Sequence, residues 1–100
     1  VPVTAHSRLR FPAMTVPTPR GTRISRLGIA VEDLAAIVPF YRDILGMPET
    51  PLDNADGAQI VGLVAGESLV ELLQPNESAS PIGKFLSKRG PGIHHICFSV

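Results

Sequence analysis

The sequence predicts a small α+β domain in which strands and helices follow one another along the chain. Three observations predict it: short apolar runs of strand length, two segments with the three-and-four apolar spacing of amphipathic helices, and two adjacent apolar runs joined by a tight turn. With 100 residues, the chain has room for one domain with a small core. Its apolar stretches are broken by Gly, Glu or Pro before they reach eighteen residues, so we expect no transmembrane helix and no membrane partner.

The first predicted elements are a strand and a helix. Residues 24–31 are apolar and rich in β-branched side chains, which is typical of a strand. Apolar side chains then recur at helical spacing over residues 33–45, with Asp33 as the capping residue and Gly46 just after the end. Pro39 lies inside this segment and has no backbone N–H, so the helix either kinks there or becomes regular only there.

A hairpin, a short helix and a last strand complete the predicted elements. The apolar runs 58–64 and 68–74 flank a glycine-containing turn, which predicts a hairpin. A Ser-Pro pair supplies a cap and a first helical residue for a helix over about 81–89. Residues 92–100 form the last strand, and the sequence stops there without a turn or a cap, so we expect the chain to be a fragment.

Residues 1–22 are predicted to be a disordered extension. They hold four of the ten prolines and show no helical or strand periodicity. All five charged side chains before Glu32 are arginines, which is typical of a transit peptide to the mitochondrial matrix, although the prolines weaken the helix that such a signal needs. Upstream sequence translated ahead of Met14 is an alternative. Without lysines or interleaved aromatics, the arginines do not indicate a nucleic-acid partner.

The single cysteine of the chain indicates the kind of cellular compartment. Cys97 cannot form a disulfide within the chain, which fits a reducing compartment such as the cytoplasm. We therefore expect a cytoplasmic protein, with the mitochondrial matrix as the alternative if residues 1–22 are a transit peptide.

The last strand contains the strongest candidate for a metal ligand. Because alternate side chains of a strand face opposite sides, His95 shares the more polar face with Cys97 and Ser99, whereas His94 lies on the apolar face. We interpret His94 as an ordinary core or surface residue and His95 as the candidate ligand.

Two further strands contribute candidates. Glu71 interrupts the apolar run 69–73, and a carboxylate buried there would need a partner or a metal ion. Arg26 shares its strand face with Gly28 and Ala30, two small residues that leave room above the sheet.

Five segments carry a resemblance to a known superfamily. They read LGIAVEDL (27–34), FYRDILG (40–46), VELLQP (70–75), SPIGKFL (80–86) and GIHHICF (92–98). From about residue 23 onward the chain resembles the vicinal oxygen chelate superfamily, which includes glyoxalases, bleomycin-resistance proteins and dioxygenases. The last two segments are most similar to its methylmalonyl-CoA epimerase family.

The resemblance implies two βαβββ modules whose sheets curve around one divalent metal ion. On this expectation, residues 23–90 are the first module and residues 91–100 are the first strand of a second module that is incomplete here. The full-length protein would be a homodimer, and the fragment by itself would be inactive.

The resemblance also implies a ligand set. Glu71 and His95 match two metal ligands of the family, Arg26 stands where the family has a strand-one histidine, and the fourth ligand would lie beyond Val100. The metal would be Co²⁺, Mn²⁺, Mg²⁺ or Zn²⁺. A guanidinium offers no lone pair to a metal. The intact segments elsewhere favour a one-base change from a His codon over a metal-free family member or an inactive homologue.

The implied activity is an isomerase acting on an acyl-CoA substrate. The metal would stabilise the enediolate formed when a proton leaves the carbon between a thioester and a carboxylate. A base and an acid on opposite faces would invert that carbon, and neither is assigned to a residue here. The alternatives are a metal-free ligand-binding protein of the same superfamily, favoured by Arg26, or a glyoxalase-type lyase or dioxygenase.

Overall fold

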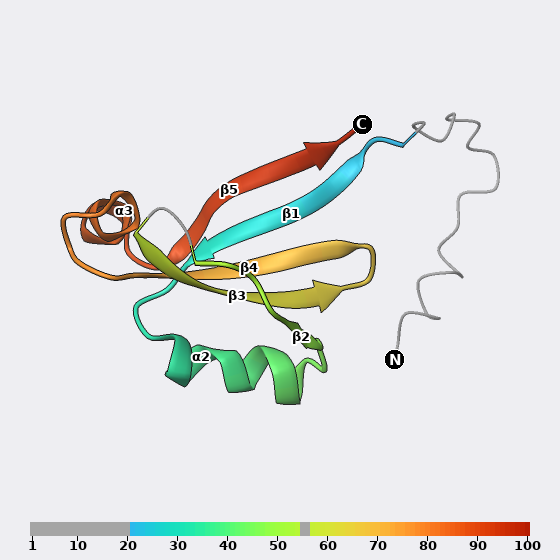
Figure 1. The fold of residues 1–100 in the computed structure, drawn as a ribbon, viewed down its shortest axis with the longest axis horizontal. Coiled ribbons are helices and arrows are strands. Elements are labelled where there is room, and N and C mark those ends of the chain that lie inside the picture. The colour runs from blue at the N-terminus through green and yellow to red at the C-terminus, as the bar shows by residue number, and fades with distance from the viewer. Residues whose placement is uncertain (1–20, 55–56) are drawn as a thin grey trace.

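The computed structural model describes residues 21–54 and 57–100, so most of the expected N-terminal extension lies outside it. The elements are, in order, β1 (Arg23–Ala30), α2 (Leu34–Pro39), η1 (Phe40–Ile44), β2 (Glu49–Thr50), β3 (Ala58–Ala65), β4 (Ser68–Pro75), α3 (Pro81–Arg89) and β5 (Gly92–Ser99), as Figure 1 shows. The predicted α+β fold is confirmed. The two-residue strand β2 was not predicted, because it lies between two prolines in a turn-rich loop.

One sheet with the strand order β2-β3-β4-β1-β5 organises the domain. β3 and β4 form the predicted antiparallel hairpin, while β1 pairs in parallel with β4 and antiparallel with β5. β1 therefore lies between the hairpin and the last strand. This arrangement brings side chains from three distant parts of the sequence next to one another.

The predicted first helix is present, but its form changes at Pro39. The side chain of Asp33 caps its first turn, as expected. Pro39 has no N–H to donate to the preceding turn. The chain continues from Phe40 as a π-helix, in which the N–H of Leu45 donates to the carbonyl of Phe40 at 3.0 Å. The helix thus starts at its cap and widens after the proline.

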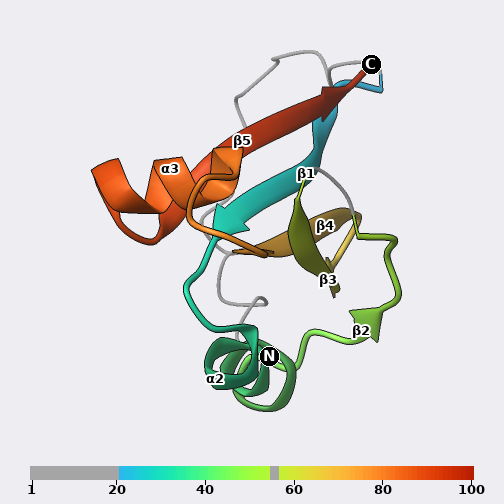
Figure 2. The same ribbon diagram turned by 60° about the vertical axis from the view of Figure 1, so that its left-hand side comes forward.

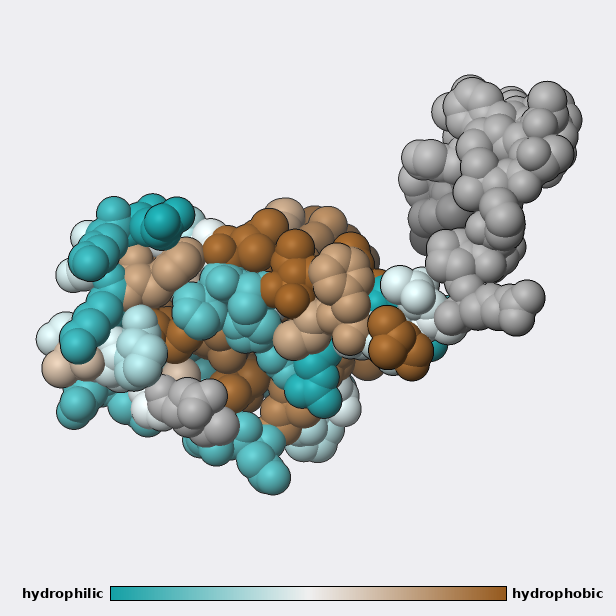
Figure 3. All heavy atoms as spheres, turned by 90° about the horizontal axis from the view of Figure 1, so that it is seen from above, coloured by the Kyte–Doolittle hydropathy of each residue, from teal (hydrophilic) through white to brown (hydrophobic). Residues whose placement is uncertain are grey.

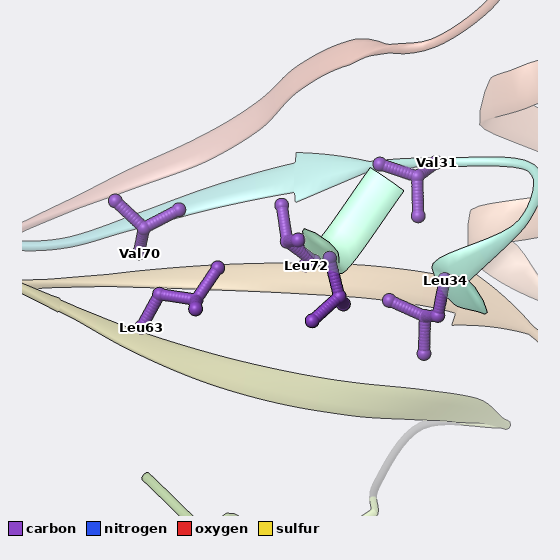
Figure 4. Packing of buried hydrophobic residues seen from close by; sticks show 6 residues of the cluster. Val31, Leu34, Leu63, Val70 and Leu72 are labelled. Carbon is purple, nitrogen blue, oxygen red and sulfur yellow. The ribbon is translucent and has the colours of Figure 1, made fainter. Parts of the chain in front are cut away.

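Two clusters of buried apolar side chains fix the helices on opposite faces of the sheet. α2 covers one face through the larger cluster, Val31, Leu34, Val38, Leu63, Val70 and Leu72, part of which is seen in Figure 4. α3 covers one end of the other face through Ala30, Ala58, Leu73 and Ile82. Figure 2 shows the two helices apart, with strands between them. No other helix of residues 21–54 and 57–100 packs on the second face.

We expect the fold to be destabilised most when a side chain of the larger cluster is shortened. Leu72 is completely buried, and we expect Leu72→Ala to lower the free energy of unfolding by about 2–5 kcal/mol because it leaves a cavity. The measurement is urea denaturation followed by circular dichroism. The matched change Leu45→Ala, at a side chain that is 53% exposed, should cost less than about 0.5 kcal/mol. Equal losses in the two variants would contradict this assignment of the core.

Candidate functional site

Four neighbouring positions form a row across the open face of the sheet: Gly62 on β3, Glu71 on β4, Gly28 on β1 and His95 on β5. Glu71 therefore has a glycine on each side. A Cβ atom on Gly28 would lie 2.2 Å from Cε1 of His95, and one on Gly62 would lie 2.8 Å from Cδ1 of Leu52. The two glycines let these neighbouring side chains lie flat on the sheet, and Glu71 between them is only 7% exposed.

The buried carboxylate of Glu71 has two different neighbours. Nη1 of Arg26 donates a hydrogen bond to Oε2 at 2.8 Å, and Nε2 of His95 lies 3.6 Å from Oε1. The side chain of Arg26 is 53% exposed, whereas that of Glu71 is 9% exposed. The structure thus brings together all three residues that the sequence singled out, and the partner of the buried carboxylate is a guanidinium.

His94 lies on the same side of the sheet as His95, so its predicted place on the apolar face is wrong. The pairing of β1 with β5 shifts by one residue beyond the Gly28–His95 pair, which leaves His94 as the extra residue of a β-bulge. Strict alternation fails at such a bulge. The Nδ1 atoms of the two histidines are 2.9 Å apart, and the His94 ring packs edge-on against Phe85 with 5.0 Å between centroids.

These side chains line one cavity of about 770 Å³ over the open face. Arg26, Glu71 and both histidines line it together with Asp53, Glu77 and Ser80, and apolar side chains such as Ile60 and Leu73 complete the lining. Small-molecule sites in proteins commonly have volumes of about 300–1,000 Å³. The cavity is therefore large enough for a small organic ligand.

Several contributors to the site escaped the sequence analysis, among them Gly62, Leu52 and the cavity-lining carboxylates Asp53 and Glu77. A glycine inside a strand is a signal for the close approach of another group, so Gly62 could have been noticed. The group that approaches it comes from the loop before β3, and no spacing in the sequence indicates that contact.

A divalent metal ion needs more donors than this site offers. Glu71 and His95 supply one oxygen and one nitrogen, and the neighbouring Arg26 has no lone pair. Catalytic zinc sites, for comparison, have three protein ligands and a water molecule. Among residues 21–54 and 57–100, no group of three His, Cys, Asp or Glu side chains is placed to hold a metal ion. The described residues therefore do not fit a complete metal site.

Because the ring of His95 lies so close to Gly28, we expect a methyl group added at Gly28 to destabilise the site. Gly28→Ala should push the His95 ring away from Glu71 and lower the free energy of unfolding by about 1–3 kcal/mol. Gly92→Ala, in the same pair of strands, adds a Cβ that has no heavy atom within 4 Å. This control should change the free energy of unfolding by less than about 0.5 kcal/mol. Urea denaturation of both variants checks the prediction, and similar values for the two would contradict it.

Two curated proteins with similar sequences are named as epimerases. The chain is 39% identical over 82 residues to "Methylmalonyl-CoA epimerase, mitochondrial" of Mus musculus, which covers 78% of this chain and 46% of the relative. It is 40% identical over 81 residues to the ethylmalonyl-CoA/methylmalonyl-CoA epimerase of Cereibacter sphaeroides, covering 78% of this chain and 60% of the relative. The chain thus spans about half the length of the curated relatives that it matches.

A solved structure of an epimerase has a fold similar to that of this chain. The structure of a methylmalonyl-CoA epimerase in complex with methylmalonyl-CoA and NH₄⁺ superposes with a TM-score of 0.69 at 36% identity, covering 78% of this chain and 60% of that chain. The family model of the glyoxalase/bleomycin resistance protein/dioxygenase superfamily matches residues 25–100, which include Arg26, Glu71 and His95. The chain belongs to this superfamily and has its glyoxalase-like fold.

Proposed function

We propose that the chain acts as a methylmalonyl-CoA epimerase-type isomerase on an acyl-CoA thioester that carries a carboxylate at C2. The observation that carries the proposal is the convergence of Arg26, Glu71 and His95 in the lining of one cavity. The relatives named as epimerases, at 39% and 40% identity, support it.

The chemistry of such a reaction explains why a charged, partly enclosed site is needed. Removing the C2 proton places negative charge on the thioester and carboxylate oxygens, and a fixed positive group beside these oxygens lowers the barrier. Glu71 is buried and holds the guanidinium of Arg26 in the lining of the cavity. A base and an acid on opposite faces of the substrate would then complete the inversion.

The divalent metal ion of the sequence analysis, with Glu71 and His95 as its candidate ligands and Co²⁺, Mn²⁺, Mg²⁺ or Zn²⁺ as the candidate ions, is an untested prediction and is not part of the proposed function. Because the described residues do not complete its coordination, the proposed reaction contains no step that depends on it. The two-module division at residues 90 and 91 is likewise a prediction.

The compartment is also a prediction, cytoplasm or mitochondrial matrix. The proposed transit peptide falls almost entirely on residues 1–20, outside the described part of the chain. Within that described part, no helix is both long and apolar enough to cross a membrane.

Proton exchange tests the proposed function. In deuterated water, the protein as its gene encodes it should exchange the C2 proton of methylmalonyl-CoA, measured by mass spectrometry. Glu71→Gln should slow the exchange at least about tenfold, because the neutral amide no longer fixes the guanidinium of Arg26 as strongly. The matched change Glu67→Gln, at a side chain that is 84% exposed, should leave the rate unchanged. Binding of the substrate without any exchange would contradict an isomerase and leave the metal-free binding protein as the explanation.

We also propose that two copies of the chain associate through β5. Within the described residues, β5 ends the sheet, and such an edge presents unpaired backbone groups. Ile96 and Phe98 on this strand are 45% and 67% exposed. Figure 3, which views the molecule from the β5 side, shows apolar side chains gathered in the middle of this surface.

Association through β5 predicts a change of mass in solution. Phe98→Lys should shift the protein from dimer to monomer in size-exclusion chromatography with light scattering, because a charged side chain opposes burial of the strand. Ile44→Lys, at a side chain of η1 that is 73% exposed, is the control and should keep the dimer mass. A monomeric wild-type protein would contradict the proposal.

A further inference from the structure

We propose that Arg26 takes the place of a divalent metal ion in this site and that its guanidinium binds the carboxylate of the substrate directly. The choice of an acyl-CoA carboxylate as the ligand rests on the proposed function. The assignment of Arg26 as the resident cation rests on geometry and charge alone.

The first argument is electrostatic. Glu71 is buried, and its negative charge is already matched by Arg26, whose Nη1 lies 2.8 Å from Oε2. A divalent ion that used Oε1 of Glu71 and Nε2 of His95 would lie beside this permanent positive charge and would be repelled by it. The guanidinium of Arg26 therefore neutralises the carboxylate of Glu71 and repels a second cation.

The second argument is that Arg26 has N–H donors that no side-chain hydrogen bond of the described residues uses. A guanidinium carries five N–H groups, and the only side-chain hydrogen bond of Arg26 within residues 21–54 and 57–100 uses Nη1. Its side chain is 53% exposed and lines the cavity. Guanidinium and carboxylate groups match each other in a two-point contact. With Glu71 behind it, Arg26 is oriented to receive a second carboxylate from the cavity.

Metal binding tests the exclusion of a second cation. Equilibrium dialysis against Co²⁺ and Zn²⁺ should leave the wild-type protein without a bound ion, whereas Arg26→His should bind one ion per chain at least tenfold more tightly. Adding Glu71→Gln to that variant should abolish the gain. A wild-type protein that holds one ion per chain, lost in Glu71→Gln, would overturn the proposal, as would an Arg26→His variant that gains no affinity.

Ligand binding tests the carboxylate contact separately from turnover. Isothermal titration calorimetry in the presence of EDTA compares methylmalonyl-CoA with propionyl-CoA, which lacks only the carboxylate. The wild-type protein should bind methylmalonyl-CoA at least tenfold more tightly, and Arg26→Gln should lose this preference. Arg23→Gln is the matched control, since Arg23 lies on the same strand with a side chain that is 52% exposed, and it should keep the preference.

Arg26→Gln alone leaves the buried carboxylate of Glu71 without its charged partner and can destabilise the fold. The double variant Arg26→Gln/Glu71→Gln is the control for this effect, because it contains no unpaired buried carboxylate. It should be folded by circular dichroism and should also lack the preference for methylmalonyl-CoA. Equal binding of the two thioesters by the wild-type protein, or a preference that survives in both Arg26 variants, would overturn the carboxylate contact. The metal-binding and ligand-binding measurements do not depend on proton exchange. A protein that does not exchange the C2 proton can therefore still confirm or contradict the role of Arg26.

Discussion

The burial of one carboxylate is the constraint on which the rest of the site depends. Glu71 lies in the middle of the sheet, where an unpaired charge would be strongly destabilising. Arg26 on the neighbouring strand supplies the compensating charge. The glycines on either side of Glu71 give the space that the side chains of His95 and Leu52 occupy.

The fold supplies this arrangement through its strand order. Because β1 lies between β4 and β5, the carboxylate, the guanidinium and the imidazole come from adjacent strands although they are far apart in sequence. α2 covers the opposite face and α3 only one end of this one, which leaves the cavity open above the row. The bulge in β5 then adds His94 to the same cavity. The scaffold thus gathers four polar side chains on one exposed face.

The presence of a guanidinium where a metal ligand was expected changes what this site can do. A metal ion polarises its ligands and is bound by lone pairs, whereas a guanidinium offers N–H donors and a positive charge. Both can stabilise negative charge that develops on oxygen. A guanidinium can therefore give electrostatic assistance of the kind that a metal ion gives, and the 2.8 Å contact with Glu71 fixes the guanidinium of Arg26 in this site.

The sequence by itself determined the main helices and strands and their order, and it singled out Arg26, Glu71 and His95, which the structure places together, because apolar periodicity, caps and a carboxylate inside an apolar run are local signals. It could not determine the π-helical turn after Pro39 or the short strand β2, since both depend on backbone partners elsewhere. Only the tertiary structure decided that Arg26 is the partner of Glu71 and that His94 joins His95. Those two facts follow from strand register and from a bulge, which are properties of paired strands and not of any one strand.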